Sequence, residues 1–147
     1  MCAAAFATQD AGAAATTKHN RATTARTISL NETGRLHLTS KKGFTLNERG
    51  SASGTISGSI YIHLHLISQT RVTAEVNIYP SRGGSLSGSG SAGYRVEGGR
   101  ASFSGTLSIT RGTGKYARAR ASGLRFTGTI QRRDDSVAVS LSGRLSL

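Results

Sequence analysis

The stretch Ser51–Ile67, SASGTISGSIYIHLHLI, alternates small or apolar residues with polar residues over nearly its whole length. Its even-numbered residues are alanine, glycine, isoleucine or leucine, and its odd-numbered residues are mainly serine, threonine, tyrosine and histidine. Successive side chains of a β-strand point to opposite faces, so a period of two predicts strand with one apolar face. A helical period of 3.6 residues does not fit this pattern.

The same alternation begins near Thr27 and continues almost to the end of the chain. Two short candidates lie around Ile28–Leu30 and Leu36–Leu38, and longer ones span Val72–Tyr79, Leu86–Val96, Ala101–Ile109, Leu124–Ile130 and Val137–Leu147. Turn-forming residues separate the later segments at Ser68–Arg71, Ser81–Gly84, Glu97–Arg100 and Arg132–Asp135. One-sided strands joined by short connections predict antiparallel pairing.

A sheet with a single apolar face must cover that face, and closure into a barrel covers it while removing the exposed edges. We therefore expect an all-β fold, a closed antiparallel barrel of about eight strands, at which number side chains fill the lumen or leave room for one small ligand. Glycines recur on the apolar face, where they are typical of the bends that barrel closure needs.

The 147 residues predict one domain, which we place at residues 27–147 behind a flexible Ala/Thr-rich tail at residues 1–26. Within the tail, Ala5-Phe6-Ala7 matches the small-x-small end of a secretory signal, so we expect an exported protein, with a cytoplasmic one as the alternative. The lone Cys2 excludes a disulfide within the chain and a zinc site built on several thiolates. No segment predicts a transmembrane helix.

Basic residues outnumber acidic ones 19 to 7, which gives a net charge of +12. Long-range attraction draws such a surface to polyanions, and Lys115, Arg118 and Arg120 are the candidate residues for this binding. A merely solvated surface is the simpler interpretation of the same charges. No long helical pattern is present, which argues against a helix that reads a DNA groove.

The segment Gly112–Ala117, GTGKYA, satisfies the G-x-G-x-x-A pattern of dinucleotide-binding loops. That pattern binds a pyrophosphate only where a long helix follows and offers its N-terminal N–H groups. Here strand alternation resumes by Leu124, which leaves room for two helical turns at most. We therefore interpret GTGKYA as a tight corner between strands and expect no nucleotide, cofactor or metal.

Three short motifs together resemble allene-oxide-cyclase-like and dirigent-like barrels: Phe103–Leu107 (FSGTL), Gly112–Ala117 (GTGKYA) and Thr127–Thr129 (TGT). The resemblance implies an eight-stranded antiparallel barrel that is often a homo-oligomer, and an isomerase or cyclase that confines an apolar substrate. The cyclases carry an inward carboxylate in mid-strand. Glu32 and Glu48 are expected at the ends of short strands as solvated loop carboxylates, so no catalytic residue is assigned.

The inward face supplies the candidate ligand-binding residues of the lumen, and Tyr94 is the polar group among them. The full set is Tyr94, Phe103, Phe126, Ile62 and Leu64. The favoured hypothesis is a small exported barrel that binds an apolar molecule or acts as a non-catalytic interaction module. The alternatives are a confinement cyclase or isomerase, and a polyanion-binding protein.

The outward face carries the residues Tyr61, His63 and His65 of the quoted stretch. A register with Ile62 opposite Ile78 places these side chains across from Tyr79, Asn77 and Glu75. An imidazole beside a carboxylate suits acid–base chemistry, and two histidines suit the start of a metal site. A solvated polar face with good cross-strand pairs is the favoured interpretation.

Overall fold

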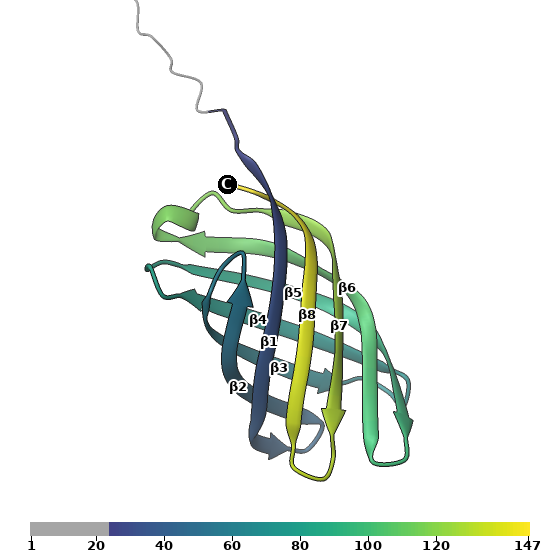
Figure 1. The fold of residues 1–147 in the computed structure, drawn as a ribbon. Helices are drawn as coiled ribbons and strands as arrows, with labels where there is room; N and C mark the ends of the chain where they lie inside the picture. The colour runs from purple at the N-terminus through teal and green to yellow at the C-terminus, as the bar shows by residue number, and fades with distance from the viewer. Residues whose placement is uncertain (1–23) are drawn as a thin grey trace, which may run out of the picture.

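The structure, a computed structural model that describes residues 24–147, is a closed barrel of eight antiparallel strands (Figure 1). Each strand pairs with its neighbours in chain order, and β8 pairs back onto β1. The elements are β1 (Thr27–Lys42), β2 (Thr45–Gly54), β3 (Gly58–Leu66), β4 (Arg71–Pro80), β5 (Ser85–Glu97), β6 (Arg100–Thr113), the 3₁₀ turn η1 (Gly114–Tyr116), β7 (Ala121–Gln131) and β8 (Ser136–Ser146). The predicted fold class is confirmed.

The barrel begins at Thr27, and most of the tail expected at residues 1–26 lies outside the described residues. The expected signal remnant Ala5-Phe6-Ala7 lies outside them as well, so export stays a prediction. Within residues 24–147 no helix is long and apolar enough to span a membrane.

The apolar residues of the alternating pattern fill the lumen as one core. Ile62, Val76 and Ile78 are almost fully buried, whereas the odd-numbered residues between them face outward. Side chains of about this size fill an eight-stranded barrel. Phe103 and Phe126 pack inside with ring centroids 5.2 Å apart.

Glycine allows a close packing contact where Phe103 crosses β7. Gly128 lies directly opposite Phe103, and a Cβ built at Gly128 would come within 2.2 Å of the Phe103 ring. The aromatic ring thus occupies the space that any larger residue at position 128 would need. This position shows why a glycine lies on the apolar face.

Two strand boundaries differ from the predictions. The short candidates around Ile28–Leu30 and Leu36–Leu38 belong to the single strand β1, and the stretch Ser51–Ile67 divides between β2 and β3. The turn Thr55–Ser57 lies inside that stretch, where Gly54 adopts a φ of +140°. Ile56 is buried although it lies in the turn, so the alternation continues through the reversal and conceals it.

The connections between the strands gather at two opposite ends of the barrel (Figure 1). At one end, here called the closed end, lie the turn 55–57, the turn 81–84 and the segment 114–120, and Ile56 and Tyr116 are buried there. At the other, called the open end, lie the turns 43–44, 67–70, 98–99 and 132–135. The four turns predicted after Leu66 overlap these connections, although Arg71, Glu97 and Arg100 belong to strands.

Candidate functional site

A cavity of about 430 Å³ lies at the open end of the barrel. Its inner wall is formed by apolar residues that project inward from several strands, and its rim carries charged residues of the strand ends and turns. It is lined by Leu38, Lys41, Gly43, Phe44, Leu46, Leu66, Tyr94, Ala101, Ile130, Arg132 and Asp135. Small-molecule sites are typically concave, mostly apolar and of this order of size.

Tyr94 lies at the mouth of this cavity because β5 extends past the start of β4. Arg71 of β4 pairs with Gly93, so Tyr94 and the residues after it continue beyond the β4 edge. The backbone N–H of Tyr94 donates to the Thr70 carbonyl at 2.8 Å, which joins β5 to the β3–β4 turn. Tyr94 also borders a second hollow of about 1040 Å³ between this turn and the β5–β6 hairpin. Its half-buried side chain is therefore accessible from two sides.

Glu48 lies one inward position deeper than the cavity wall. It is the next inward residue after Leu46 on β2, and it pairs with Leu38 on one side and Ile62 on the other. Its side chain is buried, and its Oε2 has neither solvent nor a hydrogen-bond partner. Burial raises the pKa of this carboxyl to about 7, since an apolar surrounding disfavours the charged form. Glu48 can thus hold or release a proton near neutral pH.

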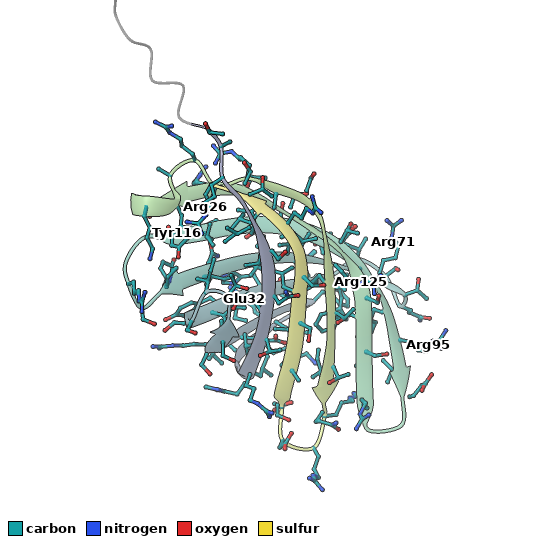
Figure 2. All side chains as sticks on the ribbon, turned by 45° about the horizontal axis from the view of Figure 1, so that its top comes forward. Arg26, Glu32, Arg71, Arg95, Tyr116 and Arg125 are labelled. Carbon is teal, nitrogen blue, oxygen red and sulfur yellow. The ribbon has the colours of Figure 1, made fainter. Side chains whose placement is uncertain are left out.

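Glu32 is a second buried carboxyl, on β1 toward the closed end (Figure 2). Its Oε1 accepts a hydrogen bond from the backbone N–H of Ile56, whereas its Oε2 has no partner. Burial raises the pKa of Glu32, and the bond from Ile56 opposes that rise. The carboxyl thereby ties the β2–β3 turn to β1.

The expectation that Glu32 and Glu48 are solvated loop carboxylates is wrong. The short strand around Ile28–Leu30 continues to Lys42, so Glu32 lies in mid-strand, and Glu48 lies in the middle of β2. Both share the parity of their inward neighbours, such as Leu30 and Leu46. That parity was the signal in the sequence that could have placed them inside.

The predicted lumen residues occupy different depths. Tyr94 lines the cavity, and Phe103 borders the neighbouring hollow while most of its ring is buried. Ile62, Leu64 and Phe126 are core residues with almost no exposed surface. The cavity is formed instead by inward residues nearer the strand ends, which the sequence did not single out.

The segment GTGKYA forms the closed-end corner. Gly114 adopts a φ of +60°, and a Cβ at Gly112 would come within 1.9 Å of the Tyr116 carbonyl oxygen. The turn η1 is three residues long, and the chain returns to strand at Ala121. No long helix follows Gly114 in the described residues, so the physical basis of a dinucleotide loop is missing here.

The predicted polyanion residues project from this corner. Lys115, Arg118 and Arg120 are exposed, and the Lys115 ammonium lies 5.1 Å from the Tyr116 ring centroid. The Arg120 guanidinium donates to the Ala119 carbonyl at 2.6 Å. Tyr116 itself is buried, so it offers no face on which a nucleic-acid base could stack.

The outward histidines lie in a different register from the one predicted. Ile60, not Ile62, pairs with Ile78, so Tyr61 faces Asn77 and His63 faces Glu75. The chain reverses between Ile67 and Arg71, one residue earlier than expected, which shifts the pairing by two residues and keeps every side chain on its face.

Each of two outward histidines is engaged by β2 through its Nδ1, His63 with Asn47 and His65 with Thr45. Across residues 24–147 no group of three or more histidine, cysteine, aspartate or glutamate residues is placed to hold a metal ion. The rings therefore act as cross-strand hydrogen-bonding groups of the outer wall.

Comparisons of the chain with protein-family models, with curated proteins and with solved structures found no match. The resemblance to allene-oxide-cyclase-like and dirigent-like barrels therefore stays a prediction that rests on GTGKYA and its flanking motifs. The expected homo-oligomer stays a prediction too.

Proposed function

We propose that this protein binds a small apolar molecule in the cavity at the open end of its barrel. The observation that carries the proposal is a hollow of about 430 Å³ with an apolar inner wall and Tyr94 at its mouth. An apolar ligand would displace water from Leu38, Leu46 and Ile130, and the Tyr94 hydroxyl would hydrogen-bond to a polar atom of the ligand.

Binding can be tested with the uncharged dye N-phenyl-1-naphthylamine, whose fluorescence rises in apolar surroundings. We expect saturable binding to the wild-type protein and its loss in Leu46→Trp, because an indole at this half-buried position fills the cavity. Tyr79→Trp adds the same side chain on the outer wall and serves as the matched control. Equal dye binding by Leu46→Trp and wild-type protein would contradict the proposal.

Native mass spectrometry of protein purified from its source organism complements the dye experiment, because it detects a natural ligand that co-purifies with the protein. A molecule retained by wild-type protein and absent from Leu46→Trp would identify the ligand. Retention of the same molecule by both proteins would place its site elsewhere.

A second candidate function, an isomerase or cyclase, is favoured by Glu48. A buried carboxyl with an unpartnered Oε2 and a pKa near 7 has the properties of a general acid or base. In this function Glu48 would exchange a proton with a ligand that reaches past Leu46.

This function can be tested on a co-purified ligand incubated with the protein in D₂O. We expect wild-type protein to introduce deuterium at carbon and Glu48→Gln to bind the ligand without introducing it. Glu75→Gln, a change of an exposed carboxylate on the outer wall, is the control. Deuterium incorporation that persists in Glu48→Gln would exclude Glu48 as the proton-transfer group.

A further inference from the structure

Exposed apolar side chains gather at the open end of the barrel. Among the described residues, the large apolar side chains that remain exposed are Phe44 (72%), Ile67 (58%), Tyr79 (50%) and Val96 (45%). Three of these lie at the open end, and Tyr79 lies on the outer wall. Exposed apolar residues that cluster in this way indicate an interaction surface, whereas scattered ones do not.

These three residues lie on neighbouring hairpin ends. The Leu66 N–H donates to the Phe44 carbonyl at 2.9 Å, which places the β1–β2 turn beside Ile67. The β3–β4 turn in turn holds β5 through the bond from Tyr94 to Thr70, two residues before Val96. Phe44 lines the cavity, Val96 borders the neighbouring hollow, and Ile67 lies on the β3–β4 connection that contacts both hairpins. These three residues are here called the apolar rim of the open end.

Each residue of the apolar rim has a cation beside it. Lys42 lies two residues before Phe44, and Arg95 directly precedes Val96. Arg71 lies beside Ile67, because the Ile67 N–H donates to the backbone carbonyl of Arg71. Figure 2 shows Arg71 and Arg95 projecting on the same side of the barrel, away from Arg26 and Tyr116.

The open end as a whole is cationic. Its seven basic residues are Lys41, Lys42, Arg71, Arg95, Arg100, Arg132 and Arg133, against the three carboxylates Glu97, Asp134 and Asp135. Glu97 pairs with Arg95 at 3.5 Å, so these two charges offset each other, and Asp134 accepts from the Ser136 hydroxyl at 2.7 Å. The remaining six basic residues still outnumber the remaining two carboxylates.

We propose that the open end docks on an anionic lipid bilayer, with the apolar rim inserted at the headgroup level and the flanking cations against lipid phosphates. Apolar tips flanked by lysine and arginine are the combination that holds peripheral proteins at such a surface. A second copy of the chain would bring like charges against these cations, whereas anionic headgroups complement them. Docking does not require the cavity to hold a ligand.

Vesicle co-sedimentation tests the surface. We expect the full chain to bind vesicles of phosphatidylcholine and phosphatidylglycerol in equal parts, to bind pure phosphatidylcholine poorly, and to dissociate as salt is raised. The double variant Phe44→Asp/Ile67→Asp should bind about tenfold more weakly, because it replaces inserted apolar groups by like charges of the lipid. Both positions are exposed, so the fold should persist, and thermal unfolding checks this.

The closed end supplies the matched control. Lys115→Ala/Arg118→Ala/Arg120→Ala removes exposed cations from the opposite end and should leave vesicle binding unchanged. A loss in this variant equal to the loss in the rim variant would show that net charge alone drives binding and would overturn the proposal. Unchanged binding by the rim variant, or no binding by wild-type protein, would overturn it as well.

A spectroscopic readout separates insertion from adsorption. The chain contains no tryptophan, so Phe44→Trp introduces a single reporter at the apolar rim, and Tyr79→Trp introduces one on the outer wall. On addition of anionic vesicles we expect the emission of Phe44→Trp to shift to shorter wavelength and that of Tyr79→Trp to stay in place. An unshifted Phe44→Trp would refute insertion.

Discussion

Two residues with the same side chain have opposite relations to water in this barrel. Glu75 faces solvent from β4, whereas Glu48 is buried among the apolar residues of the lumen with its Oε2 unpartnered. Burying a carboxyl without a partner is unfavourable, and the group reduces that cost by staying protonated. A buried carboxyl that carries such a cost is a candidate for function, as perturbed carboxyls often are.

The buried Glu48 predicts a pH-dependent stability. Its pKa rises from the ordinary 4.5 to about 7 in the folded protein, so the folded state keeps a proton that the unfolded chain releases. The free energy of unfolding should therefore fall as pH rises from 4.5 to about 7, by roughly 3 kcal/mol, and level off above that range. Glu32, whose pKa is also raised, acts in the same direction.

Urea unfolding at pH 5 and pH 8 measures this slope. Glutamine does not titrate, so Glu48→Gln should reduce the difference in the free energy of unfolding between pH 5 and pH 8. A change in stability that is equal at both pH values does not affect this comparison. Glu75→Gln should retain the difference, since Glu48 is still present. An unchanged slope in Glu48→Gln would show that Glu48 is not the titrating group.

The contact between Gly128 and Phe103 predicts a second effect at the residue scale. Gly128→Ala places a methyl group 2.2 Å from the Phe103 ring carbon, so the ring or the strand must move, at a cost of about 1–3 kcal/mol. Gly93→Ala is the matched control, because the nearest atom to its Cβ is the Ser104 carbonyl oxygen at 3.8 Å. Thermal unfolding should show a lower melting temperature only for the first variant.

At the scale of elements, the corner that follows β6 shows how a short motif seals a barrel end. The Ala117 N–H donates to the Gly114 carbonyl and the Ala119 N–H to the Tyr116 carbonyl, which hold η1 in a single turn. That turn directs the Tyr116 ring inward, where it packs beside Gly84. The closed end therefore depends on the Tyr116 ring, whose position is set by the corner glycines Gly112 and Gly114.

Truncation of this ring should open the closed end. Tyr116→Ala removes a buried aromatic side chain and should destabilise the protein by about 3 kcal/mol or more, whereas Tyr116→Phe keeps the ring and should be close to wild type. Chemical unfolding followed by far-UV circular dichroism measures both. Equal stability of the alanine and phenylalanine variants would show that Tyr116 does not hold the end closed.

On the scale of the whole molecule, folding separates charges that are close in sequence. Arg118 and Arg120 lie at the closed end, whereas Arg132 and Arg133 lie in the β7–β8 turn at the open end. Basic residues that lie within sixteen positions of one another in the sequence are therefore divided between two surfaces. Polyanion binding, which stays a prediction, has to be assigned to one of them.

Retention on a heparin column makes that assignment. If Lys115, Arg118 and Arg120 form the polyanion site, Arg118→Ala/Arg120→Ala should elute at clearly lower salt than wild-type protein. Arg132→Ala/Arg133→Ala removes the same charge from the open end and should elute later than the first variant. Equal shifts in the two variants would indicate attraction by net charge without a site.

The alternation of apolar and polar residues determined the fold class, because residues two apart must share a face and the apolar faces must be covered. It also determined which side of the wall Tyr94, Phe103 and His63 occupy. The strand ends were harder to predict: Ile56 keeps the alternation through the turn 55–57, and β1 unites two segments that appeared separate.

Only the tertiary structure decided the site. Depth inside a barrel depends on where each strand ends and on the register with its neighbours, and neither is a property of one strand. The inward parity of Glu48 was visible in the sequence, but its place beneath Leu46, Leu38 and the cavity needed the pairing of three strands. The asymmetry between an end sealed by Tyr116 and an open end ringed by Phe44, Ile67 and Val96 likewise arises only when the strands are brought together.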